Sequence, residues 1–293
     1  MLKKDGIIIE DPYNILNDNF VEMVDTHVIP NLSKNDVQMD DLPQPVTESK
    51  FICNTIDDKT LSKIIDSIKP KWSAGYDDIP MKIIKEAKLP LIKPLLHVIN
   101  ASLITGVYPT ELKVSKVIPI YKKGDRTDPL NYRPLAIQPS LSKIFEKCVL
   151  IQLVNYFENN NLLEVDQHGY RKRSTLSALI DYIEHILENL DEGYNIVGAF
   201  LDLTKAFDSV DHKILLEKLK RYGINGKELS WIKSYLEGRR QFVNIKYTDK
   251  NYQHNVKSHT KDMYYSVPQG SAYPTAYTYI GFIPVLVLLG GYT

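Results

Sequence analysis

Asp202 is the residue of this 293-residue chain whose place in the sequence most clearly suggests chemistry. It follows a mainly apolar run at residues 196–201, which predicts a short buried β-strand that begins after Gly193. An ionised carboxylate at the end of such a strand is costly unless a cation or several hydrogen-bond donors compensate it. A rigidly held carboxylate can bind a hard, oxygen-seeking cation such as Mg²⁺. An aspartate that only caps a turn would leave the same pattern.

Four short phrases, one of which contains Asp202, follow one another in a fixed order. They are Asn131-Tyr132-Arg133-Pro134-Leu135, Asp166-Gln167-His168-Gly169-Tyr170-Arg171, Phe200-Leu201-Asp202-Leu203-Thr204-Lys205-Ala206-Phe207-Asp208 and Val267-Pro268-Gln269-Gly270-Ser271. No single phrase is diagnostic, but together they resemble the reverse transcriptase (RNA-directed DNA polymerase) domain of non-LTR retrotransposons, jockey-type mobile elements in particular. The resemblance covers roughly two thirds of the chain, from Ser73 to Ser271.

That resemblance implies template-directed addition of dNTPs, with an RNA template and a DNA primer as partners and Mg²⁺ as cofactor. Two divalent cations about 4 Å apart can hold the attacking and the leaving oxygen in such a reaction. By resemblance, Asp202 is catalytic and binds metal, and the backbone carbonyl of Leu203 assists it. The residues that would bind the nucleotide are Arg133, Arg171, Phe207, Gln269 and Gly270.

The resemblance also suggests what the nucleotide-binding residues would do. Phe207 would put a ring beneath the incoming sugar and so favour deoxynucleotides, and Arg171 would lie against the triphosphate. Gln269 would lie beside the templating pair, where Gly270 permits close approach of the backbone. Ordinary structural roles are the alternatives: a core position for Phe207, a sheet edge or an ion pair for Arg133, and a plain turn for Gln269.

Additional positive charge should come from the fingers of the polymerase. The basic residues concerned are Lys113, Lys116, Lys122, Lys123, Arg126, Lys172 and Arg173. Lysines can bind phosphates as point charges, and arginines can bind them as bidentate forks. Solvated surface side chains would show the same pattern, so these residues are candidates for phosphate contact as a group.

The sequence departs from the family after Gly270. The family's aromatic-x-Asp-Asp phrase is missing, and no acidic residue follows Asp262. We expect residues 272–293 to be an aberrant uncharged tail that arose from a shifted reading frame or a wrong splice. The domain would then be truncated at its C-terminus and inactive by itself, because one carboxylate in place of three cannot hold two cations close together. A loss of only ~5 kcal/mol of transition-state stabilisation slows a reaction more than a thousandfold.

The elements that would position these residues are a mixture of helices and strands. Apolar periodicity predicts helices near residues 61–68, 79–87, 90–105, 140–157, 176–190, 211–222 and 227–236, and strands near residues 114–121, 131–137, 196–201, 241–247 and 263–267. Ser140 and Asp211 should cap two of the helices. This mixture gives an α/β (α+β) fold, and the resemblance implies a right-hand polymerase fold with fingers and a partial palm but no thumb.

Charge and the motifs divide the chain into four expected regions. Residues 1–50 form an acidic leader or linker, residues 51–190 the fingers, residues 191–271 a partial palm, and residues 272–293 the tail. The first 60 residues carry five Lys and Arg against twelve Asp and Glu, a net charge of −7. The remainder carries 31 against 24, a net charge of +7, and a basic body of this kind suits a nucleic-acid binder.

The cysteines and the apolar segments indicate an intracellular protein of the cytoplasm or nucleus. Cys53 and Cys148 are far apart in sequence and lack nearby His, which argues against a disulfide framework or a zinc site. No signal peptide is visible at the N-terminus. The apolar run at residues 280–289 is about half the ~20 residues that a spanning helix needs, so we expect no membrane partner. No protein partner is evident.

Two other functions remain open from the sequence. The chain could be a catalytically dead fragment that binds nucleic acid through its basic fingers. It could also be a helical interaction protein in which the four phrases occur by accident. A phosphate-contacting surface must lose affinity steeply as salt rises, so the salt dependence of RNA or DNA binding separates the last alternative from the others.

Overall fold

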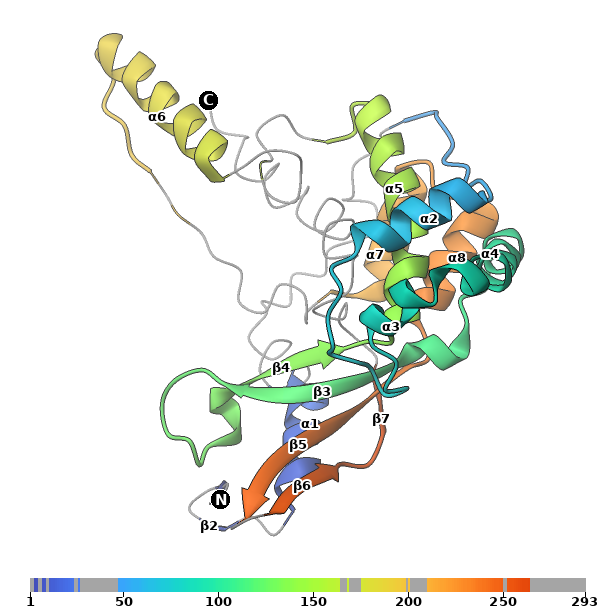
Figure 1. Cartoon of the computed structure of the whole chain (residues 1–293). Helices are drawn as coiled ribbons and strands as arrows, with labels where there is room; N and C mark the ends of the chain where they lie inside the picture. The colour runs from blue at the N-terminus through green and yellow to red at the C-terminus, as the bar shows by residue number, and fades with distance from the viewer. Residues whose placement is uncertain are drawn as a thin grey trace.

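The fold is a helical body joined to a small mixed β-sheet (Figure 1). The computed structural model describes residues 3–4, 7–8, 11–23, 26, 47–163, 168, 175–198, 200, 210–249 and 252–263. The helices are α1 (Pro12–Met23), α2 (Asp58–Ser67), α3 (Met81–Glu86), α4 (Lys88–Thr105), α5 (Ser140–Asn159), α6 (Thr175–Asp191), α7 (His212–Arg221) and α8 (Gly226–Leu236), with short 3-10 turns at Thr110–Lys113 and Pro129–Asn131. The strands are β1 (Lys3–Lys4), β2 (Ile7–Ile8), β3 (Val114–Tyr121), β4 (Tyr132–Ile137), β5 (Arg239–Asp249), β6 (Tyr252–Lys257) and β7 (Lys261–Met263).

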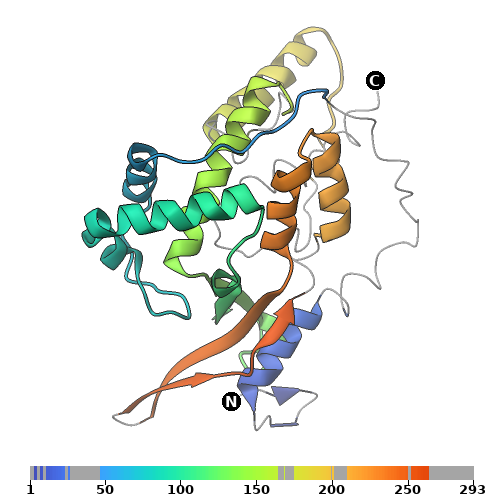
Figure 2. The same cartoon turned by 90° about the vertical axis from the view of Figure 1, so that its right-hand side faces the viewer.

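The main sheet has the strand order β4-β3-β5-β6, and β7 also pairs with β5. Strands β3 and β4 form an antiparallel hairpin in which Ile120 lies opposite Arg133. Strands β3 and β5 are parallel, with Val114 opposite Arg240, so the chain between them must cross over and does so through the helical body. The long ribbon of β5 and β6 extends away from the helices (Figure 2).

One face of the sheet is covered by α1. Leu16 packs there with Val117 of β3 and Val243 of β5, all at most 2% exposed. Strand residues alternate between the two faces of a sheet, so the odd-numbered side chains of β3 point toward α1. Part of the expected acidic leader therefore contributes to the core of the sheet.

The larger core lies among α2, α4, α5, α7 and α8. Tyr108 is fully buried at its centre, with ring centroids of Phe145, Trp231 and Tyr235 at 6.0, 5.3 and 5.0 Å in edge-to-face arrangements. Aromatic rings attract one another in this geometry because a positive ring edge meets a negative ring face. The helices predicted near residues 61–68, 90–105, 140–157, 211–222 and 227–236 are confirmed in this region.

A buried polar network joins this core to the sheet. Glu146 of α5 accepts hydrogen bonds from Ser142 Oγ at 2.8 Å and from the Tyr235 hydroxyl at 3.3 Å. In the amide orientation that satisfies both neighbours, the Gln138 amide nitrogen donates to Glu146 at 2.7 Å and its oxygen accepts from Arg239 at 2.8 Å. Because Gln138 follows β4 and Arg239 begins β5, the network ties both strands to α5.

Two predicted caps have different outcomes. Asp211 is confirmed as the N-cap of α7, because its carboxylate accepts from the backbone N–H groups of Lys213 at 2.7 Å and Ile214 at 3.1 Å. The prediction for Ser140 is wrong. Pro139 occupies the N-cap position of α5, and the Ser140 hydroxyl instead donates to the Ile79 carbonyl at 2.8 Å.

The strand predicted at residues 196–201 is not formed in its described part. Residues 194–198 and 200 have no regular secondary structure, and Val197 and Phe200 are 93% and 83% exposed. A strand needs a neighbour that satisfies its backbone groups. In the described ranges no strand pairs with this segment. An apolar run suggests a strand in the middle of a sheet, but in this sheet β3 lies between β4 and β5.

The strands near the C-terminal end of the described chain are more extensive than predicted. Strand β5 runs from Arg239 to Asp249, two residues beyond the prediction at each end, and the polar strand β6 has no counterpart in the prediction. Strand β7 begins at Lys261 and includes Met263, while residues 264–267 of the predicted strand lie outside the described residues. Within the parts of the chain that the structure describes, no helix combines the length and apolar character that crossing a membrane requires.

Candidate nucleic-acid interface

The predicted site residues fall largely outside the region that the structure describes. Those outside it are Arg171, Asp202, Leu203, Phe207, Gln269 and Gly270. Arg133 is described, as are most of the basic residues of the predicted fingers. The structure therefore bears on Arg133 and on the described basic residues of the fingers, and the roles of the other site residues stay predictions.

Arg133 lies on the face of the sheet opposite to α1. Its side chain is exposed on β4, next to Ile120 of β3, and has no hydrogen-bond or ion-pair partner among the described residues. Ile118 and Leu135 lie opposite each other on the same face and are 37% and 41% exposed. An arginine without a partner beside exposed apolar side chains can contact a phosphate while a base or sugar lies over the apolar part.

The loop between β3 and β4 holds three further cations at the end of this hairpin. Lys122, Lys123 and Arg126 are exposed. The Arg126 guanidinium lies 4.9 Å from the centroid of the Tyr121 ring, and the Tyr132 hydroxyl donates to the Arg126 carbonyl at 2.8 Å. The loop is ordered by these tyrosines and by two carboxylates, because Asp125 accepts from the Thr127 N–H at 2.8 Å and Asp128 from the Leu130 N–H at 2.9 Å. Three exposed cations and two carboxylates therefore share this loop, which keeps a small excess of positive charge.

Two lysines of the predicted fingers are not available in the same way. Lys113 is 8% exposed, and burial followed by the nearby Arg239 charge lowers its pKa. Lys116 forms an ion pair with Asp78 at 3.2 Å, and its side chain is 13% exposed. Lys113 would have to leave its buried position, and Lys116 its ion pair with Asp78, before either ammonium group could reach a phosphate.

A second basic surface surrounds an exposed tryptophan, and the sequence reasoning missed it. Trp72 is 66% exposed, and the Lys82 ammonium lies 4.7 Å from its ring centroid. Two helices contribute lysines with helical spacing, Lys82 and Lys85 on α3 and Lys143 and Lys147 on α5. We call this the Trp72–lysine surface; it comprises Lys71, Trp72, Lys82, Lys85, Lys143 and Lys147.

Close packing of a turn onto α5 brings these residues together. A Cβ atom added at Gly75 would lie 2.6 Å from the backbone nitrogen of Pro139, so only glycine permits this approach. The Lys82 N–H donates to the Lys71 carbonyl at 3.4 Å, which places the start of α3 beside the same turn. The lysines are far apart in sequence, from 71 to 147, and no local pattern predicts that they share a surface.

Two pairs of lysines on this surface repel each other, Lys85 with Lys147 and Lys71 with Lys143. Burial and then the charge of Lys85 lower the pKa of Lys147. Burial and Lys71 lower the pKa of Lys143, against an opposing effect of Glu146. In the described ranges, none of Lys71, Lys82, Lys143 and Lys147 forms an ion pair with a carboxylate. A bound polyanion would relieve this repulsion, and the exposed indole offers a face on which a base can stack.

No metal centre is formed by the described residues. His, Cys, Asp and Glu side chains do not gather in groups of three or more anywhere in the ranges that the structure describes. The predicted ligands, the Asp202 carboxylate and the Leu203 carbonyl, are oxygen donors of the kind that Mg²⁺ prefers.

Comparisons with known proteins show what this chain is similar to. Residues 120–277 match the family described as Reverse transcriptase (RNA-dependent DNA polymerase). The chain is 30% identical over 222 residues to the probable RNA-directed DNA polymerase from transposon BS of Drosophila melanogaster, which covers 72% of the chain and 23% of that protein. It is 31% identical over 221 residues to the RNA-directed DNA polymerase from mobile element jockey of Drosophila melanogaster, which covers 74% of the chain and 23% of that protein. The chain thus spans less than a quarter of the length of either relative.

Proposed function

The chain belongs to the reverse transcriptase family, of the non-LTR retrotransposon type, and from this premise we propose that it binds an RNA template, a DNA primer and a dNTP, the substrates of template-directed DNA synthesis. One observation carries this proposal. The family match over residues 120–277 includes every predicted site residue, from Arg133 to Gly270. Because template, primer and dNTPs meet inside the cell, we place the protein's action there.

We propose the following arrangement of the right-hand polymerase fold. Residues 51–190 form the fingers and residues 191–271 the first part of the palm. Arg133 and Arg171 contact the triphosphate, Phe207 contacts the sugar, and Gln269 with Gly270 lies beside the templating pair. The exposed position of Arg133, away from α1, supports its share in this arrangement.

The metal-binding part of the proposal concerns Asp202 and Leu203. Mg²⁺ held there would neutralise charge that develops on the phosphates during transfer. The chain's own contribution is a carboxylate and a carbonyl oxygen for the cation, and arginines for the triphosphate. Since the sequence has no acidic residue after Asp262, we propose that this 293-residue polypeptide binds its substrates without extending a primer.

The Trp72–lysine surface supports nucleic-acid binding independently of the metal site. Its four lysines without ion-pair partners in the described ranges and its exposed indole suit single-stranded RNA or DNA, with the lysines on phosphates and Trp72 against a base. A helical protein that carried the four phrases by accident would have no reason to assemble these side chains on one surface.

Binding of a single-stranded RNA oligonucleotide at several salt concentrations tests this function. In the Lys143→Gln/Lys147→Gln variant, we expect the slope of log affinity against log salt to become shallower by roughly 0.7 for each phosphate that the protein no longer neutralises. Trp72→Ala should weaken binding by about 1–3 kcal/mol if a base stacks there. Lys59 and Lys63 are a matched control, since they are exposed, also four residues apart, and lie on α2. An affinity that does not depend on salt, or equal effects of both lysine pairs, would contradict the proposal.

A further inference from the structure

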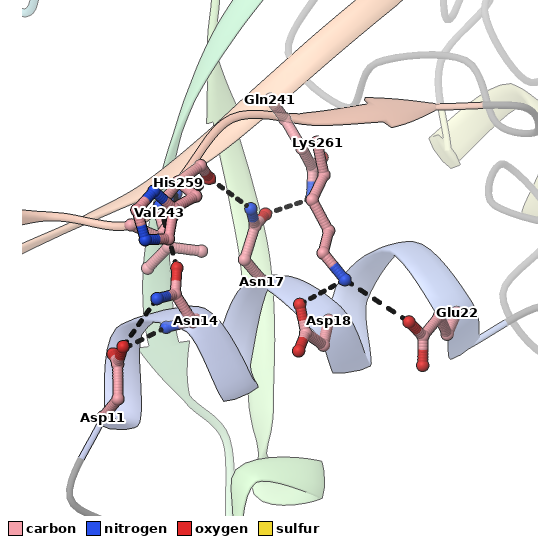
Figure 3. Close-up of polar contacts among 10 residues, drawn as sticks. Asp11, Asn14, Asn17, Asp18, Glu22, Gln241, Val243, His259 and Lys261 are labelled. Carbon is pink, nitrogen blue, oxygen red and sulfur yellow. Dashed lines mark hydrogen bonds and ion pairs between the residues drawn. The ribbon is translucent and has the colours of Figure 1, made fainter.

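Helix α1 is bound to the turn before β7 through one of its faces (Figure 3). The His259 N–H donates to Asn14 Oδ1 at 2.8 Å, and the His259 carbonyl accepts from Asn17 Nδ2 at 2.9 Å. Both backbone polar groups of His259 are thus satisfied by α1. Asp11 in turn accepts from the Asn14 side chain at 2.6 Å, which fixes the orientation of that amide.

Asn17 also connects this turn to the centre of the sheet. Its side chain accepts a hydrogen bond from Gln241 Nε2 of β5 at 3.1 Å. Asn17 is 1% exposed and Gln241 is 4% exposed, so the bridge is out of contact with solvent. A buried amide whose partners lie on two different segments determines how those segments sit relative to each other, because any displacement leaves a buried polar group unsatisfied.

Opposite charges add a contact at the start of β7. Lys261 forms ion pairs with Asp18 and, at 3.4 Å, with Glu22, both on the same face of α1 as Asn14. Hydrogen bonding to Asp18 is the main reason that the pKa of Lys261 is raised. Helix α1 contains no Lys or Arg of its own, so its carboxylates are available for this partner.

These contacts fix the point from which the chain continues toward Gln269. Lys261 lies opposite Gln241 and Met263 opposite Arg239, so β7 is in register with the start of β5. Gln269 follows Met263 by six residues. An extended chain spans at most about 3.3–3.6 Å per residue, so a stretch of six residues can reach no farther than roughly 20 Å.

We infer that α1 positions the segment carrying Gln269 by holding residues 258–263, with Asn17 as the principal positioning residue. This inference rests on the proposed function, in which Gln269 lies beside the nucleotide. Helix α1, which precedes the family-matched region, thereby contributes to nucleotide binding. The rival role for α1 is simply to cover the apolar face of the sheet around Val117 and Val243.

Amide hydrogen exchange of the 293-residue protein distinguishes the two roles. Asn17→Ala should speed exchange at residues 258–263 at least tenfold and leave β3 within twofold of the wild type, because the bridge is local. Lys261→Gln should also speed exchange at residues 258–263, but by less, because it leaves the buried hydrogen bond between Asn17 and Gln241 intact. Asn19→Ala is the matched control, since Asn19 is on the same helix and its side chain has no hydrogen bond within the described residues.

The same experiment reads nucleotide binding. With primer–template and a dNTP present, the wild type should show slower exchange at residues 264–271, and Asn17→Ala should need at least fivefold more dNTP for half of that protection. Equal acceleration across β3 and residues 258–263 would leave α1 as a cover and overturn the inference. So would nucleotide protection that is unchanged by Asn17→Ala. If even the wild type shows no protection, the proposed function itself fails.

Discussion

Burial decides what the individual ionisable residues of this protein can do. Lys113 and Lys143 are both lysines, yet Lys113 is buried near Arg239 whereas Lys143 is half-buried and lies near Lys71. The sequence indicates that both are basic and cannot indicate which is covered. Arg133 is a candidate from the sequence, and its exposed position on β4 is compatible with either a phosphate contact or a sheet-edge role.

The two cysteines give a prediction about reactivity. Burial is the main cause that raises the pKa of Cys53 to about 11 and that of Cys148 to about 12, from 9.0. At pH 8 the thiolate fraction should therefore fall about 100-fold or more, since each pKa unit changes it tenfold. We expect maleimide to modify both thiols at least about 100-fold more slowly in the native protein than in urea.

The same shifts make stability depend on alkaline pH. The folded state holds these thiol protons more tightly than the unfolded state, so the two states differ in bound protons only above about pH 9. The free energy of unfolding should fall as pH rises from 9 toward 11, and less so in Cys53→Ala/Cys148→Ala. For the reactivity prediction, rapid maleimide modification of the native protein at pH 8 would show that the two cysteines are not buried.

Most of the secondary-structure elements could be predicted because their signals are local. Helices α2, α4, α7 and α8 carry apolar periodicity, and Gly106, with φ 70°, ends α4 where the sequence predicts. The failures concern information that is not local. Residues 196–200 have the composition of a buried strand but no described partner strand, and β6 is polar and forms because β5 lies beside it.

The cap of α7 gives a test of local stability. Asp211→Ala removes the acceptor for the N–H groups of Lys213 and Ile214, and such a loss costs about 1 kcal/mol. Urea denaturation should show this decrease, and Asp211→Asn should recover most of it because asparagine also caps helices well. Unchanged stability of Asp211→Ala would mean that α7 is held by its packing on α8 alone.

Charge is distributed unevenly along the chain. The first 60 residues carry a net charge of −7 and the rest +7. Part of the negative charge of the first 60 residues is neutralised within the protein, where Asp18 and Glu22 form ion pairs with Lys261. Of the 31 basic residues after residue 60, eight lie on the Trp72–lysine surface and in the β3–β4 loop, five on the former and three in the latter. The candidate interface therefore depends on long-range folding, while the four phrases that indicate the family are readable from the sequence alone.

The central claim is that Asp202 binds a divalent cation in a polymerase site. The most direct test is Mn²⁺ binding, followed by electron paramagnetic resonance, with primer–template and a non-hydrolysable dNTP present. We predict at least tenfold weaker Mn²⁺ binding in Asp202→Ala and wild-type binding in Asp211→Asn, whose side chain caps α7. Equal Mn²⁺ affinity of Asp202→Ala and the wild type would contradict the claim.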